Sequence, residues 1–504
     1  MDINFDISDK DWIAKWAKYS PMSVAIHDLD QKLELCYSDL NQWIEKLAQY
    51  LCTTYDLQKG DRLCVLSMNR WEYVVLFFAC QRTGAILVPL NYRLTVAEMS
   101  YQLEDANPKV LLFESEFAEI IESLETAVTY KMAINTLFDS AEKAYKSAIL
   151  SDDIEVVFDQ SCMILYTSGT TGNPKGAMIT NKMLFWNSIN TGLRLNLTQQ
   201  DTIITFAPFF HTGGWNVLTT PVLHRGGKVL ITKKFEPEET LKLCEQYKVS
   251  ILFGVPTMMQ MLADQKIFDA INLKSIRYAI VGGEPMAIPL IKKWIEKGIP
   301  IRQGYGLTEF GPNVFSLNEE DALTKIGSVG FANFYIQTKI VDDKAKEVDK
   351  EEIGELLLKG PVITPGYWND SEATASNIVD GEWFCTGDLV KQDTDGYFYI
   401  VGRKKDMFIS GAENVYPAEI EKVIEAHSAV YEVAVIGAKD EKWGEVGLAY
   451  IVLKPDNACT ENDIKAYCKA QLAKYKVPKH IRFIESLPKS DSGKILKKTL
   501  KKIP

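Results

Sequence analysis

Residues 166–176 read Tyr-Thr-Ser-Gly-Thr-Thr-Gly-Asn-Pro-Lys-Gly. Glycines allow a backbone to turn several N–H groups toward one ligand, which makes a concavity that binds anions. The hydroxyl side chains and Lys175 add further donors and a positive charge. The apolar run at 162–166, directly before this stretch, is typical of a buried strand. The sequence therefore predicts a phosphate-binding loop that is anchored on a strand.

This loop differs from the Walker A pattern. That pattern requires a lysine followed by serine or threonine, whereas Lys175 is followed by Gly176. The alternative is a flexible surface turn, but a linker has no use for a Pro-Lys pair after so many hydroxyls. We therefore expect a phosphate site of another type.

Length and composition indicate a globular protein of at least two domains, because 504 residues exceed the usual size of one core. Hydrophobic residues make up 46% and charged residues 24%, which is ordinary globular composition. No apolar run reaches bilayer-spanning length, and the acidic N-terminus does not resemble a signal peptide. The nine scattered cysteines favour free thiols in a reducing compartment, without a zinc site or disulfides. We expect a cytoplasmic protein.

The net charge of −11 disfavours nonspecific binding of nucleic acid. The charge is uneven, because residues 403–504 hold 19 Lys/Arg and 14 Asp/Glu, a net charge of +5. Such a basic module on an acidic body either binds nucleic acid or closes over a small polyanion. No interleaving of aromatic and basic residues is present, so the second interpretation is favoured.

The order of strand-like and helix-like segments predicts the domain organisation. Apolar runs at 63–67, 110–113, 203–207, 251–254 and 278–281 alternate with amphipathic stretches at 40–50 and 237–247, an α/β pattern with largely parallel sheets. From about Gly327 short strands and turns indicate a small antiparallel subdomain. The charged stretch 402–406 is a candidate hinge, followed by a compact α+β module. The predicted domains are residues 1–402 and 403–504.

Four further motifs carry candidate site residues, and each has a structural alternative. Residues 303–309 read Gln-Gly-Tyr-Gly-Leu-Thr-Glu. The tyrosine could stack on a planar ring and the glutamate could supply an oxygen ligand to Mg²⁺. The alternative is a glycine-rich turn before a helix. Asp388 either accepts bonds from vicinal hydroxyls or satisfies its own turn. His211 lies among aromatics, either as a core residue or in a loop beside a ligand. Residues 488–494 end in a lysine that alone would be a solvated charge.

In this order and spacing, the motifs resemble those of the adenylate-forming superfamily, which includes acyl-CoA synthetases, luciferases and the adenylation domains of peptide synthetases. The resemblance extends from about Tyr37 to Lys494. It implies a large N-terminal domain of two helix-flanked sheets plus a small β-barrel, joined to a small mobile α+β lid. It also implies two steps: a carboxylate attacks the α-phosphate of ATP to give acyl-AMP and pyrophosphate, and a thiol such as CoA then displaces AMP.

The resemblance implies a role for each motif residue. The β- and γ-phosphates of ATP would lie on Thr167, Ser168, Gly169, Thr170, Thr171, Gly172 and Lys175. Mg²⁺ would be held by Thr167 and Glu309, and the α-phosphate would be reached by Thr308. Adenine would stack on Tyr305, with Gly283, Glu284, Gln303 and Gly304 nearby, and the ribose would bind Asp388 and Arg403. Lys494 would stabilise the transition state of step one. Lys405 would be the hinge, and Gly411 and Trp443 would flank the path of CoA.

The same resemblance places the acid near His211, Trp215, Val255, Thr257, Gly283, Gly306 and Phe310. We expect Gly254, Gly283 and Gly306 to leave room for an elongated apolar acid. No aspartate that would recognise an amino acid occurs in residues 211–215, and no carrier domain is expected after Pro504. The leading prediction is a CoA ligase for a medium- or long-chain fatty acid.

Three alternatives remain open. The first is an aryl acid of the cinnamate or succinylbenzoate type, since Phe209, Phe210 and Trp215 suit a ring as well as an alkyl chain. The second is transfer of the acyl group to a separate carrier protein. The third is a non-catalytic nucleotide-binding scaffold, which the intact set of Glu309, Asp388, Arg403 and Lys494 disfavours. Assembly as a homodimer is also left open.

Overall fold

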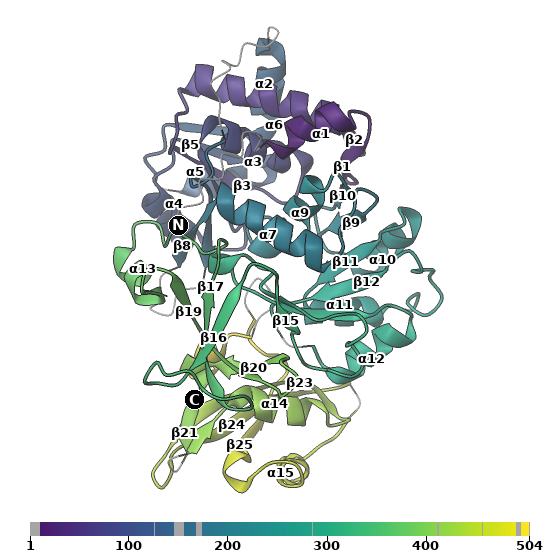
Figure 1. Cartoon of the computed structure of the whole chain (residues 1–504), viewed down its shortest axis with the longest axis vertical. Coiled ribbons are helices and arrows are strands. Elements are labelled where there is room, and N and C mark those ends of the chain that lie inside the picture. Colours follow the sequence, from purple (N-terminus) through teal and green to yellow (C-terminus); the bar gives the residue numbers. More distant parts are fainter. Residues whose placement is uncertain are drawn as a thin grey trace.

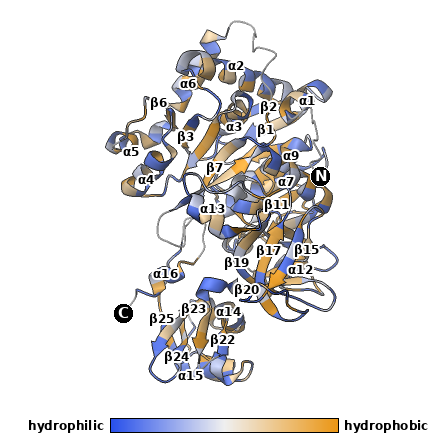
Figure 2. Ribbon diagram, turned by 60° about the vertical axis from the view of Figure 1, so that its left-hand side comes forward, coloured by the Kyte–Doolittle hydropathy of each residue, from blue (hydrophilic) through white to orange (hydrophobic). Residues whose placement is uncertain are grey.

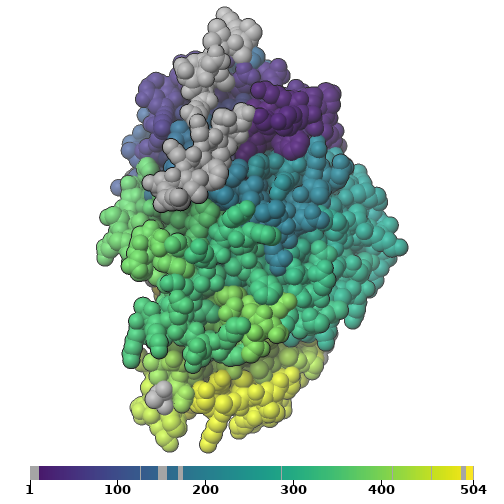
Figure 3. Space-filling view, viewed as in Figure 1, coloured from purple at the N-terminus to yellow at the C-terminus, as the bar shows by residue number. Residues whose placement is uncertain are grey.

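The computed structural model describes residues 11–124, 126–145, 156–167, 174–284, 286–410, 413–455, 457–489 and 495–502. Two large sheets with helices around them form the upper and middle parts of the molecule, and residues after about 403 form its lower end (Figures 1 and 3). None of the helices in this described part of the chain combines the length and apolar composition needed to cross a bilayer.

The first sheet has six strands and ends in the hairpin that carries the phosphate-loop motif. Its strands run parallel except for the last pair, which is antiparallel. In spatial order they are β6 (Tyr130–Ala133), β5 (Val110–Phe113), β3 (Arg62–Leu66), β4 (Ile86–Leu90), β7 (Ser161–Thr167) and β8 (Lys175–Thr180). The hairpin β7–β8 therefore lies at one edge of this sheet.

The second sheet has nine strands and is parallel through its centre. In spatial order they are β15 (Phe331–Ala332), β14 (Phe315–Ser316), β13 (Ile301–Tyr305), β12 (Tyr278–Val281), β11 (Ile251–Gly254), β9 (Thr202–Thr205), β10 (Lys228–Ile231), β1 (Val24–Asp28) and β2 (Leu33–Cys36). The central strands β9 to β12 are short and mostly buried, as expected of a sheet covered on both faces. Strand β11 has the orange colour of apolar residues in Figure 2.

One helix forms the shared core of the two sheets. Helix α3 (Trp71–Thr83) contacts β4 and β7 of the first sheet and β1 of the second. Nearly all of its residues are buried, so it is hydrophobic around its whole circumference. The other helices of this part are α1 (Trp12–Tyr19), α2 (Tyr37–Tyr55), α4 (Val96–Ala106), α5 (Ala118–Ser123), α6 (Ile134–Ala144), α7 (Asn181–Arg194), α8 (Thr212–Trp215), α9 (Thr219–His224), α10 (Pro237–Gln246), α11 (Pro256–Ala263), α12 (Ile288–Glu296) and α13 (Ser371–Asn377).

A third sheet of five antiparallel strands occupies the place predicted for the small barrel. Its strands are β16 (Gln337–Val341), β17 (Ile353–Lys359), β18 (Ile378–Val379), β19 (Trp383–Gln392) and β20 (Phe398–Arg403). A short 3₁₀ helix, η3 (Lys404–Asp406), follows directly and leads into the C-terminal unit.

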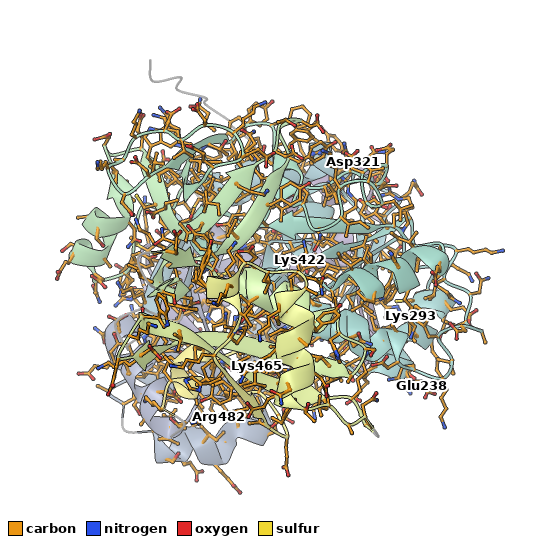
Figure 4. The ribbon with its side chains drawn as sticks, turned by 90° about the horizontal axis from the view of Figure 1, so that it is seen from below. Glu238, Lys293, Asp321, Lys422, Lys465 and Arg482 are labelled. Atoms are coloured by element: carbon orange, nitrogen blue, oxygen red, sulfur yellow. The ribbon has the colours of Figure 1, made fainter. Side chains whose placement is uncertain are left out.

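The C-terminal unit is α+β and has its own core, because two clusters of buried residues lie wholly within residues 408–500. Its elements are β21 (Phe408–Ser410), β22 (Glu413–Val415), α14 (Pro417–Glu425), β23 (Val430–Asp440), β24 (Gly444–Leu453), α15 (Glu461–Lys469), β25 (His480–Phe483) and α16 (Lys497–Leu500). Lys422 of α14 approaches the large domain, with Nζ 3.4 Å from the position a Cβ on Gly327 would take (Figure 4). The predicted fold class, a large α/β domain plus a small α+β domain, is confirmed.

The N-terminal helix α1 is fastened to α9 through His224. The Trp12 ring stacks on the His224 ring with centroids 4.0 Å apart, and Trp16 Nε1 donates to the His224 carbonyl at 2.9 Å. His224 Nδ1 lies 2.7 Å from Ser188 Oγ of α7. Burial, assisted by the neighbouring Arg225 charge, lowers the pKa of His224 to about 3. The folded chain therefore holds this imidazole neutral at physiological pH.

This burial predicts a loss of stability in mild acid. Between pH 6.5 and 3 the unfolded chain binds a proton at His224 that the folded chain does not, so the free energy of unfolding falls as the pH falls. From pH 7 to pH 5 the loss from this group should be about 2 kcal/mol. His224→Phe keeps the stack on Trp12 and should remove that part of the loss. Urea unfolding of both proteins at the two pH values checks it, and an equal loss in both would exclude His224 as the cause.

Candidate active site

The phosphate-loop motif forms the β7–β8 hairpin, and its two ends are brought face to face. Thr167 and Lys175 are cross-strand partners in this hairpin. The predicted residues Ser168, Gly169, Thr170, Thr171 and Gly172 lie outside the described residues. Lys175 Nζ lies 3.7 Å from Asp370 Oδ2 and 5.5 Å from the centroid of the Tyr367 ring. The lysine is thus held at the start of β8, opposite Thr167.

Glu309 lies directly against this hairpin, although 142 residues separate it from Thr167. It is carried by the short 3₁₀ helix η2 (Thr308–Phe310), which also carries Thr308 and follows β13. Glu309 Oε1 accepts hydrogen bonds from Thr167 Oγ1 at 3.3 Å and from Tyr367 Oη at 3.0 Å. The structure therefore brings together the two predicted Mg²⁺ ligands.

The donors present at this point suit Mg²⁺. No group of three or more His, Cys, Asp or Glu side chains within the described ranges could form a metal cage. Mg²⁺ does not require one, because it is usually held by one or two carboxylates together with substrate phosphates and water. One carboxylate, one hydroxyl and a neighbouring phosphate loop fit that mode of binding.

The residues predicted for the nucleoside also converge. Asp388 is buried and is the cross-strand partner of Arg403 in the β19–β20 pair. Its Oδ1 lies 2.7 Å from Arg403 Nε, and its Oδ2 accepts from Tyr305 Oη at 2.5 Å. Burial and the Asp388 carboxylate raise the pKa of the Tyr305 hydroxyl, which stays protonated and remains a donor.

Gln303 has a supporting position. Its side chain is buried, with Oε1 accepting from Met286 N at 3.2 Å and Nε2 donating to Ser328 O at 3.3 Å. These bonds fix the loop between β12 and α12, where Gly283 has a φ of +91° and is followed by Glu284. Gly304 lies in β13 beside Tyr305. Gln303 thus shapes the loop that was predicted to surround adenine.

The predicted acid pocket is divided between half-buried and fully buried residues. His211, Val255 and Thr257 are half-buried, and the His211 ring lies 4.6 Å from the Phe210 ring. Trp215 and Phe310 are 0% exposed. Trp215 Nε1 donates to Phe209 O at 2.5 Å and its ring packs on Phe209, so its position is that of a core residue.

The room expected at two glycines is filled by the protein itself. A Cβ on Gly306 would lie 2.0 Å from Pro312 O, and one on Gly254 would lie 3.1 Å from Met259 Sδ. These glycines allow close packing of the chain on itself, and they do not open space for an elongated acid. At Gly283, the third glycine of that expectation, room for an elongated acid stays a prediction.

The C-terminal unit carries the remaining predicted residues. Lys405 is exposed on η3, whereas the adjacent Lys404 pairs with Glu355 Oε2 at 2.9 Å and Asp343 Oδ1 at 3.1 Å. Trp443 is 48% exposed in the turn between β23 and β24, where it lines an open cavity with Ile409 and Glu445. Gly411 and the predicted catalytic Lys494 lie outside the described residues.

Sequence reasoning missed the segment at 364–370. Thr364 N donates to Glu309 O at 2.8 Å, and Trp368 N donates to Gly176 O at 2.7 Å. In the same segment, Tyr367 contacts Glu309 and Asp370 contacts Lys175, as described above. No spacing in the sequence relates Tyr367 to Glu309, which precedes it by 58 residues. The sequence contains no signal that would have identified these contacts.

Comparison with known proteins gives consistent matches over nearly the whole chain. Residues 13–368 match the model of the AMP-binding enzyme family, and residues 419–494 match that of the AMP-binding enzyme C-terminal domain. A feruloyl-CoA synthase of Amycolatopsis is 36% identical, covering 96% of this chain and 97% of that protein. A long-chain-fatty-acid–CoA ligase of Mycobacterium tuberculosis is 35% identical, covering 96% of each. The o-succinylbenzoate CoA synthetase of Bacillus subtilis, solved with its acyl-adenylate, superposes with a TM-score of 0.88 at 32% identity, covering 98% of each chain.

Proposed function

The chain belongs to the AMP-binding, adenylate-forming enzyme family, and on that premise we propose that it joins an aryl carboxylic acid to CoA at the expense of ATP. Its enzyme class, an AMP-forming acid–CoA ligase, is shared with the curated relatives. The identity of the acid substrate is what we propose. We expect an acid with a planar ring that bears a short side chain ending in the carboxylate.

The nucleotide would bind where the β7–β8 hairpin, η2 and the β19–β20 pair meet. Asp388 would accept bonds from the ribose hydroxyls, with Arg403 holding that carboxylate in place at 2.7 Å. Lys175 and the hairpin would hold the β- and γ-phosphates, which leave as pyrophosphate. The acid carboxylate then attacks the α-phosphorus, and the thiol of CoA displaces AMP from the resulting acyl-AMP. Thr167 and Glu309 would hold Mg²⁺, which neutralises charge on the phosphates.

The observation that carries the choice of acid is the filling of the space at Gly254 and Gly306 by Met259 and Pro312. These two positions therefore add no room for a long alkyl chain. Two half-buried rings lie in this region: His211, beside the buried Phe210, and Phe253, whose Cε1 lies 3.4 Å from where a Cβ on Gly213 would be. Flat rings favour stacking with an aryl acid.

A fatty acid is the second candidate, favoured by the 35% identity to a long-chain-fatty-acid–CoA ligase. Transfer to a carrier protein and a cytoplasmic location remain predictions from the sequence. The role of Lys494 as the step-one lysine also remains a prediction, as does a division into domains near residue 402.

A pyrophosphate-release screen tests the proposal. The panel should contain hydroxycinnamic acids, indoleacetic acid, 2-succinylbenzoic acid, fatty acids of six to eighteen carbons and the amino acids, each with CoA, with a carrier protein and with neither. We expect the highest kcat/KM for an aryl acid with CoA. A higher value for any fatty acid would overturn the aryl assignment, and no release with any acid would favour a non-catalytic scaffold.

A further inference from the structure

The segment at 364–370 forms an extra strand-like layer over the edge of the phosphate-loop hairpin. Ala177 of β8 forms an antiparallel bridge with Tyr367, Met178 N donates to Gly366 O at 3.1 Å, and Trp368 N donates to Gly176 O at 2.7 Å. The segment thus has a fixed register on β8. Because Tyr367 is held by its backbone, its side chain has a defined direction.

With this orientation of its side chain, Tyr367 contacts Glu309 through its hydroxyl group. Tyr367 is buried, with 9% of its surface exposed, and Oη donates to Glu309 Oε1 at 3.0 Å. Thr167 Oγ1 approaches the same oxygen at 3.3 Å. Within the part of the chain that the structure describes, both side-chain hydrogen bonds of Glu309 end on Oε1, so Oε2 remains for another ligand.

The ring of Tyr367 has a second contact with the phosphate site. Lys175 Nζ lies 5.5 Å from the ring centroid, within the range of a cation–π interaction. One side chain therefore contacts both the carboxylate predicted to hold Mg²⁺ and the lysine predicted to hold phosphate. Burial and the Glu309 charge raise the pKa of the Tyr367 hydroxyl, so it remains a donor over the working pH range.

We propose that Tyr367 is a positioning residue for adenylate formation: its hydroxyl orients Glu309 so that Oε2 faces the metal of the bound nucleotide. The inference rests on the proposed function, because it assumes a metal–ATP substrate. Carboxylates that ligate metals are themselves commonly held by hydrogen bonds, and loss of such a partner weakens metal binding by about 10- to 100-fold. Tyr367 acts through Glu309 and has no direct role in the reaction.

The test compares Tyr367→Phe with Tyr399→Phe, a matched control in which the lost hydroxyl donates to Asp393 Oδ2 at 3.3 Å in the third sheet. Tyr367→Phe retains the ring beside Lys175. Binding of Mn²⁺ with α,β-methylene-ATP, followed by electron paramagnetic resonance, should weaken by at least about tenfold in Tyr367→Phe and by less than about twofold in the control. The Mg²⁺ requirement for pyrophosphate release should rise in parallel, while thioester formation from supplied acyl-AMP stays unchanged.

Unchanged Mn²⁺ binding in folded Tyr367→Phe, with the wild-type melting temperature, would overturn the proposal. Should that variant not fold, Thr374→Val removes the hydroxyl that accepts from Tyr367 N at 2.9 Å, changes no predicted metal ligand and should also weaken Mn²⁺ binding; normal binding there would overturn the proposal. The Mn²⁺ measurement needs no acid substrate. A failed acid screen combined with weakened Mn²⁺ binding would reject the proposed function and leave this inference standing.

Discussion

Glu309→Gln should slow acyl-adenylate formation by about 10²- to 10³-fold, in the range seen when one preorganised electrostatic group is removed. Glutamine has the same shape, and its oxygen can still accept the bonds from Thr167 and Tyr367. The amide nitrogen then takes the place of Oε2, so both the negative charge and the oxygen that would face Mg²⁺, a cation that prefers oxygen ligands, are lost. Pyrophosphate release measured against Mg²⁺ concentration checks this expectation.

Glu319→Gln is the control for that variant, because Glu319 is also paired, with Arg302 at 3.3 Å, but is half-exposed. It should change the rate little. Thioester formation from supplied acyl-AMP should survive in Glu309→Gln, because the phosphates have already left at that stage. Equal loss of both half-reactions, or an unchanged Mg²⁺ requirement, would contradict a role in holding the metal.

Gly306→Ala should destabilise the protein by about 3 kcal/mol and lower activity with every acid, because the added Cβ would lie 2.0 Å from Pro312 O. A backbone carbonyl cannot move aside as a flexible side chain can. The chain between Tyr305 and Phe310 must then shift, which displaces both the Tyr305–Asp388 bond and Glu309. Urea unfolding and pyrophosphate release with several acids measure the two effects.

Gly304→Ala is the matched control, since a Cβ there would lie 3.4 Å from Phe315 O, an ordinary contact. Gly304 lies in β13, on the other side of Tyr305 from Gly306, so Gly304→Ala should retain most of the stability. Normal stability of Gly306→Ala together with a changed acid preference would restore the view that this glycine makes room for the substrate.

Much of the fold could be predicted from the sequence because short apolar runs between turns determine buried strands. The runs at 110–113, 251–254 and 278–281 coincide with β5, β11 and β12, and the amphipathic stretch at 237–247 became α10 (Pro237–Gln246). The change of pattern near Gly327 marks the start of short antiparallel strands. These features depend on local residue order, which a single sequence displays directly.

The site could be predicted only in part, because motifs identify residue types but not their neighbours. The pairs Thr167–Glu309 and Asp388–Arg403 were expected near one another and are in contact. The contact of Tyr367 with Glu309 depends on the register of a segment far along the chain. Likewise, the sequence does not state which atom fills the space at Gly306. Both the contact of Tyr367 and the packing at Gly306 depend on how distant segments of the chain pack together.

The extra layer at 364–370 also has a consequence for how the chain can be divided. Strand β8 is the edge of the six-stranded sheet, and an uncovered edge strand invites pairing with other chains. Its cover comes from residues that follow two strands of the third sheet, β16 and β17. A fragment that ends near residue 335 would contain all of both large sheets and still expose this edge. Such a fragment should aggregate, so the third sheet is needed for the solubility of the two sheets before it.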